Sequence, residues 1–191
     1  MDAGDYHGRL AKHVSDFFPE AAFRELTWPH GPIGQHLPNW RVMAGQLAPL
    51  KGAWAYFTHG AWEVTQDSHA FEFFMLSSEQ RDDINAELLA MITFFYGDPR
   101  SGLDVGKVLN IGKPWGENSD LDHILISLPY PFGPDFEHAV IGEKHIRYLW
   151  ALPISKAEAD YARQHGFEAL EARLEQAAID AGDPFRKSVV P

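Results

Sequence analysis

The chain has 191 residues, no cysteine and a formal net charge of −11. The missing cysteine excludes disulfide bonds, thiolate nucleophiles and metal sites built on cysteine. The negative charge argues against a nucleic-acid partner, because such binding depends on lysine and arginine side chains that neutralise phosphates.

The length and an apolar content of 45% predict one domain over residues 1–191. The first residues are polar and acidic, which predicts no signal peptide. The longest apolar stretch, Leu88–Tyr96, is too short to span a bilayer. We therefore expect a soluble, cytoplasmic protein without a membrane partner.

A helix and three strands are predicted in the first part of the chain. Apolar side chains recur at helical spacing over Tyr6–Phe18. Alternation with aromatic enrichment then predicts strands at Trp40–Ala44, Ala53–Thr58 and Ala70–Leu76.

The strongest helix signal covers residues 78–96. Ser77-x-x-Gln80 has the pattern of a capping box, and Gly97 follows the last apolar position. Between them, apolar residues that include Leu88 recur every three to four positions, which predicts a stripe that faces the core.

The second half predicts two more strands and two helices. The strands are His123–Leu128 and His145–Leu152, with Pro153 as the end of the second. Residues 155–158 form a Ser-x-x-Glu capping box that opens a helix, and another helix covers residues 167–182. This order of elements predicts an α+β fold with a mainly antiparallel sheet and packed helices.

Acidic residues concentrate in residues 61–104, where nine carboxylates accompany two arginines. A field of this sign attracts a protein partner with a basic surface. The alternative, a solvated face that only keeps the protein soluble, stays open. Asp82, Asp83 and Glu87 are the acids of our candidate partner-binding surface.

Three aromatic residues complete this candidate surface. Trp54 and Tyr56 share one face of a predicted strand, and Trp115 lies in a loop rich in glycine and proline. Exposed aromatic side chains are good interface anchors. Burial under a helix or a loop is the alternative for each of them.

Histidines and carboxylates gather between residues 120 and 145, and they are Asp120, Asp122, His123, Asp135, Glu137, His138, Glu143 and His145. Such side chains can ligate a metal or form an acid–base pair. Their spacings match no known ligand set, and the sequence has no serine-nucleophile motif or phosphate-binding glycine loop. We therefore predict no cofactor, no metal and no enzyme activity.

The second half of the chain carries an ordered series of segments: HILISLPYPF (123–132), IRYLWALPIS (146–155), KAEADYARQHGFEALE (156–171) and DPFRKSVV (183–190). This series resembles the suppressor-of-fused (SUFU) family, in particular its short bacterial members. The resemblance is strongest over residues 106–190 and weaker over residues 52–96.

The resemblance implies an α+β fold and a role in protein recognition rather than chemistry. Bacterial relatives look like immunity proteins that neutralise a partner toxin, whereas eukaryotic members hold an extended peptide. Those eukaryotic members have an acidic residue after the glycine that matches Gly106, and this chain has Lys107 there. We therefore transfer no peptide-binding residue from them.

Three hypotheses follow. The first is a non-catalytic binding protein, in particular an immunity protein against a toxin domain of a bacterial polymorphic toxin system. The second is an adaptor that adds an extended partner strand to a free sheet edge. The third is a small hydrolase or metal-dependent enzyme that uses the cluster between Asp120 and His145.

Overall fold

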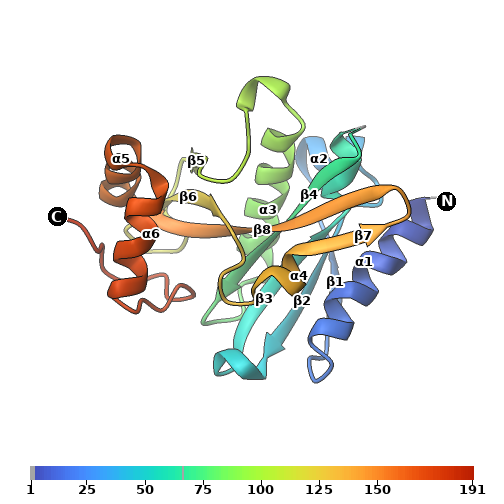
Figure 1. Ribbon diagram of the computed structural model, residues 1–191, viewed down its shortest axis with the longest axis horizontal. Coiled ribbons are helices and arrows are strands. Elements are labelled where there is room, and N and C mark those ends of the chain that lie inside the picture. Colours follow the sequence, from blue (N-terminus) through green and yellow to red (C-terminus); the bar gives the residue numbers. More distant parts are fainter. Residues whose placement is uncertain (1–2, 66) are drawn as a thin grey trace.

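The computed structural model describes residues 3–65 and 67–191, which form an eight-stranded sheet with helices on both faces (Figure 1). The strands are β1 (Arg24–Thr27), β2 (Arg41–Leu47), β3 (Ala53–His59), β4 (His69–Ser77), β5 (Val108–Asn110), β6 (Leu121–Ser127), β7 (His138–Ile141) and β8 (Lys144–Ser155). The α-helices are α1 (Ala3–Phe17), α2 (Gly31–His36), α3 (Asp82–Tyr96), α4 (Pro134–Glu137), α5 (Lys156–His165) and α6 (Phe167–Gln176). Short 3-10 helices are η1 (Ala48–Leu50), η2 (Ala61–Val64) and η3 (Pro99–Ser101).

The strand order is β1-β2-β3-β4-β8-β6-β5, and β7 pairs with the first part of β8. Only β4 and β8 run parallel among the described strand pairs, and the others are antiparallel. The α+β fold with a mainly antiparallel sheet is therefore confirmed. The long strand β8 is the centre of the sheet, because β4 lies on one of its edges and both β7 and β6 lie along the other.

Side chains of β8 alternate between the two faces, as the pleat of a strand requires. Tyr148, Trp150 and Leu152 face a cluster that α1, α4, α5 and α6 help to form, which we call the front cluster. Leu149 and Ala151 face the opposite cluster, which α2 and α3 cover and which we call the rear cluster. Figure 1 shows α1 at one end of the front face and α5 and α6 at the other.

Helix α3 is correctly predicted as a core helix, but its start is wrong. Ser77 still belongs to β4, and its hydroxyl donates to the carbonyl of Glu79 rather than capping the helix. The helix begins at Asp82, after Arg81 as the N-cap, which makes no side-chain cap bond. The Ser77-x-x-Gln80 pattern therefore marks a turn before the helix and not a capping box.

The second predicted capping box is confirmed. Ser155 accepts from the amide of Glu158, and the Glu158 carboxylate accepts from the amide of Ser155. The prediction that Pro153 ends the preceding strand is wrong, because β8 continues to Ser155 with Pro153 opposite Ile124. The last helix, α6, was predicted over residues 167–182, but it ends at Gln176.

None of the helices in the described residues is long and apolar enough to cross a membrane.

Candidate functional site: an acid-rimmed groove

An open groove crosses the front face of the sheet between α6 and the β2–β3 turn. It consists of two hollows of about 460 and 700 Å³ that share five wall residues, Pro131, Trp150, Ala178, Ile179 and Ala181. The groove exists because α1 and α4 cover one end of this face and α5 and α6 cover the other, which leaves the sheet between them uncovered.

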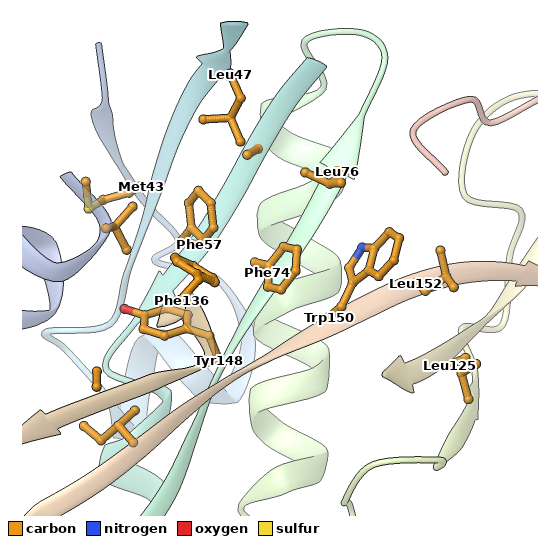
Figure 2. Close-up of a cluster of buried hydrophobic side chains, with 14 of the residues drawn as sticks. Met43, Leu47, Phe57, Phe74, Leu76, Leu125, Phe136, Tyr148, Trp150 and Leu152 are labelled. Atoms are coloured by element: carbon orange, nitrogen blue, oxygen red, sulfur yellow. The ribbon is translucent and has the colours of Figure 1, made fainter. Parts of the chain in front are cut away.

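The floor of the groove is apolar. Trp150 lies in it between Phe74 of the neighbouring strand β4 and Leu152 of its own strand β8 (Figure 2). The rings of Phe74 and Trp150 stack with their planes 5° apart and their centroids 6.0 Å apart. Trp150 is only 8% exposed, and its indole nitrogen Nε1 has no hydrogen-bond partner among the described residues.

One wall of the groove carries three glutamates from α6. Glu168, Glu171 and Glu175 follow one another at intervals of three and four residues, which places them on one face of the helix. The hydroxyls of Ser127 and Tyr130 donate to the Glu171 carboxylate at 2.6 and 3.1 Å. The carboxylate of Glu171 is therefore held in a defined orientation at the centre of this wall.

Partial burial raises the pKa of Glu171, and the negative charge of Glu168 adds to the rise. The hydrogen bonds from Ser127 and Tyr130 oppose this rise. The chemistry of the groove is thus an apolar surface beside a line of acceptors, which suits recognition of a segment that carries both apolar and cationic groups.

The structure places three of the six predicted binding residues together on the opposite side of the sheet. The guanidinium of Arg24 pairs with Asp82 at 2.6 Å and lies 5.5 Å from the centre of the Trp54 ring. The hydroxyl of Tyr56 donates to the same Asp82 carboxylate at 3.2 Å. Tyr56 is fully buried, so a partner can reach only Trp54 and Asp82 of this group.

The other three predicted residues lie farther along α3 and its neighbouring loop. Asp83 is exposed, and Glu87 pairs with Lys113 at 2.5 Å. Trp115 is buried, and its indole N–H donates to Asn85 at 3.0 Å. The partner-binding role of the six residues stays a prediction, but burial of Tyr56 and Trp115 leaves the four others as its accessible part.

The suspected cluster between residues 120 and 145 comes together only in part. The ring nitrogens Nδ1 of His138 and Nε2 of His145 lie 2.9 Å apart, and Glu137 lies 3.6 Å from His138, but His123 is far from them. His123 lies opposite Ile154 near the end of β8, whereas His145 lies near its start beside Val140 of β7. Nine residues of extended chain separate these ends, which corresponds to about 30 Å at the usual rise per residue. Among the described residues, no group of three histidines or carboxylates is placed to hold a metal ion.

Sequence reasoning missed the three glutamates of α6. Their spacing places them on one face of the helix beside the buried Leu170 and Leu174, but it does not show that this face borders a groove. The fold and the groove together define an α+β protein whose helix-covered sheet leaves one apolar, acid-rimmed surface open.

The chain belongs to the SUFU family, because the profile of the family described as Suppressor of fused protein (SUFU) matches residues 40–187. The immunity protein YqcF of Bacillus subtilis (strain 168) is 29% identical over 149 residues, which are 74% of this chain and 77% of that protein. The predicted family is therefore confirmed.

Solved structures share the fold of this chain. A SUFU homologue of Neisseria gonorrhoeae FA 1090 superposes with a TM-score of 0.80 at 29% identity over 98% of both chains. The Sufu–Fu complex matches with a TM-score of 0.73 at 12% identity over 96% of this chain and 92% of that one. Drosophila Suppressor of Fused matches with a TM-score of 0.62 at 12% identity over 93% of this chain and 50% of that one.

Proposed function

We propose that this chain acts as a single-domain, non-catalytic immunity protein that binds and neutralises a toxin in the cytoplasm. The membership in the SUFU family and the similarity to an immunity protein support a role in protein binding. The open groove beside Trp150 is the observation that carries the proposal, because it offers a shaped apolar surface with defined polar groups.

Neutralisation works by steric occlusion in this proposal. A segment of the toxin enters the groove and anchors the two proteins, while the rest of the interface covers the active site of the toxin. A small apolar anchor surrounded by polar contacts is sufficient for tight binding, since a few buried residues carry most of the energy of an interface.

Co-expression tests this function. A toxin domain encoded beside the gene for this chain should arrest growth alone and be tolerated together with the chain. Ala172 is exposed and lines the groove, so Ala172→Trp should fill the groove without a change of charge and abolish the protection. Ala22→Trp, at an exposed position outside the groove, should keep it. Protection by both variants would place the toxin elsewhere on the surface.

The free edge of β7 supports a second candidate function, the addition of an extended partner strand. Within the described residues β7 pairs only with β8, and Val140 is 76% exposed on it. An unpaired edge of this kind accepts another strand. Partner binding at this edge would slow hydrogen exchange of the His138–Ile141 amides, whereas binding in the groove would leave their exchange unchanged.

A further inference from the structure

We infer that the groove recognises an arginine or lysine side chain, presented on an extended apolar segment of the partner, through the three glutamates of α6. This inference rests on the proposed function of the groove as the docking surface. It adds the chemical class of the group that enters it, and Glu171 is the residue at the centre of the recognition.

The three carboxylates have no cation of their own. Within the described residues, neither Glu168, Glu171 nor Glu175 lies within ion-pair distance of a lysine or an arginine. Negative charges three and four residues apart on a helix repel each other. A cationic side chain between them would remove this repulsion.

Other helices of the same chain match their acids internally. Lys12 pairs with Asp16 on α1 at 2.7 Å, and Lys156 pairs with Asp160 on α5 at 2.5 Å, each four residues apart. The helix dipole explains Glu168 in the first turn of α6, because that end of a helix favours negative charge. It does not explain Glu175, because the C-terminal end of a helix disfavours an acid.

Independent support comes from the floor of the groove. Trp150 is nine-tenths buried, lines both hollows and keeps an indole N–H that no described group accepts. The nitrogen itself is enclosed by the protein, so Trp150 meets an occupant of the groove through the carbon atoms of its ring. An apolar floor of this kind suits the apolar side chains of an extended segment.

The shape of the groove favours a peptide over a bare cation. Within the described residues, the three glutamates do not converge on one position that could hold a metal ion. Leu152, Leu174 and Ile179 line the same hollow and offer contact to apolar side chains on either side of the cation. An extended segment with alternating apolar and basic residues fulfils both requirements.

The experiment uses the full chain and the blocked peptide acetyl-Val-Arg-Val-Arg-Val-amide. Its control replaces both arginines by citrulline, which has nearly the same shape and no charge. The Trp150 indole N–H signal, assigned with Trp150→Phe, reports binding in two-dimensional NMR titrations. We expect a dissociation constant on the order of 1 mM for the arginine peptide and at least about tenfold weaker binding of the citrulline peptide.

Two variants test the role of the carboxylates. Glu171→Gln should remove most of the preference for arginine over citrulline, whereas Glu143→Gln, the same change at an exposed turn outside the groove, should keep it. Equal binding of the two peptides, or an unchanged preference in Glu171→Gln, overturns the inference. Absence of binding of the arginine peptide also overturns it.

The failure of this inference is distinguishable from failure of the proposed function. If Ala172→Trp loses protection against the toxin while charge makes no difference to peptide binding, the groove docks the partner but does not select a cation. A Trp150 signal that shifts with protein concentration in the absence of peptide would show a second copy of the chain in the groove, and this outcome would also overturn the inference.

Discussion

Glu72 of β4 is a carboxylate that the protein encloses completely. It accepts hydrogen bonds from the hydroxyl of Thr58 and from the backbone amides of Gly60 and Trp62. Burial raises its pKa to about 7, and these hydrogen bonds limit the rise. The side chain thus fixes the turn that contains η2 at the cost of an unfavourable charge.

Glu72 should make folding less favourable as pH rises from about 4.5 to 7. In this window the folded chain keeps a proton on Glu72 that the unfolded chain has released, so the free energy of unfolding falls. Over the whole window this loss in the free energy of unfolding is about 3 kcal/mol. The buried His59, whose pKa burial lowers to about 3, changes stability in the opposite direction below pH 6.5. Only a comparison with a variant therefore isolates Glu72.

The measurement compares urea unfolding of the natural chain and of Glu72→Gln at several pH values. The difference in the free energy of unfolding between the two proteins should shift in favour of the variant as pH rises through this window, because glutamine does not ionise. A difference that stays constant from pH 4.5 to pH 7.5 would contradict the raised pKa of Glu72.

At the scale of elements, α3 covers the rear cluster with one face and leaves the other to solvent. Leu88 is 2% exposed within this cluster, whereas Phe94 on the same helix is 49% exposed. Leu88→Ala should lower the free energy of unfolding by about 2–5 kcal/mol because it leaves a cavity under the helix. Phe94→Ala should cost less than about 1 kcal/mol, since its ring is half in solvent.

Chemical denaturation of the two variants checks this prediction. The pair is matched, because both changes remove a large apolar side chain from the same helix. Equal losses of stability would mean that the outer face of α3 is also covered in solution, for example by a second copy of the chain.

Regular elements with a strong apolar period were predictable from the sequence, and short ones were not. The strands β1, β5 and β7 have three or four residues each, which is too short for a pattern to stand out. Sequence reasoning had no signal for tertiary pairing, and only the fold shows that these segments lie along the edges of the sheet.

Contacts between distant segments also explain two of the segments that resemble the SUFU family, residues 156–171 and 183–190. The carboxylate of Glu158 closes its capping box, and it also accepts from Arg186 at 2.7 and 2.8 Å. Arg186 donates in addition to the carbonyl of Pro153. The segment near residue 186 is therefore tied to the start of α5. The sequence predicted the local capping box, but the pairing across 28 residues needed the fold.

At the scale of the whole molecule, much of the predicted acidity is already neutralised. Of the nine carboxylates in residues 61–104, Glu72 is buried. Four more pair with an arginine or a lysine, and they are Glu79, Asp82, Glu87 and Asp98. Glu63 contacts the ring of His7 at 2.5 Å. Asp67, Asp83 and Asp104 form no ion pair in the described part of the chain. A count of charges along the sequence thus overestimates the field of this segment.

The chain should still associate faster with a basic partner at low salt, because its net charge is −11. Asp83 and Asp104 are exposed and unpaired in the described residues, so their reversal tests steering without breaking an internal ion pair. Asp83→Lys together with Asp104→Lys should slow association by about threefold at low ionic strength and leave dissociation nearly unchanged. At about 0.5 M salt the double variant and the natural chain should associate with the partner equally fast, because screening then acts within a few ångströms.

Stopped-flow or surface-based kinetics with the cognate partner measures both rates. Charge reversal of all three candidate acids, Asp82, Asp83 and Glu87, is a weaker choice. It would break the ion pairs of Asp82 with Arg24 and of Glu87 with Lys113, and so disturb the start of α3. Faster dissociation of the double variant would show that Asp83 or Asp104 contacts the partner directly. Unchanged association at low salt would show that the acids of residues 61–104 form a solvated face, and that attraction of the partner depends on the glutamates of the groove.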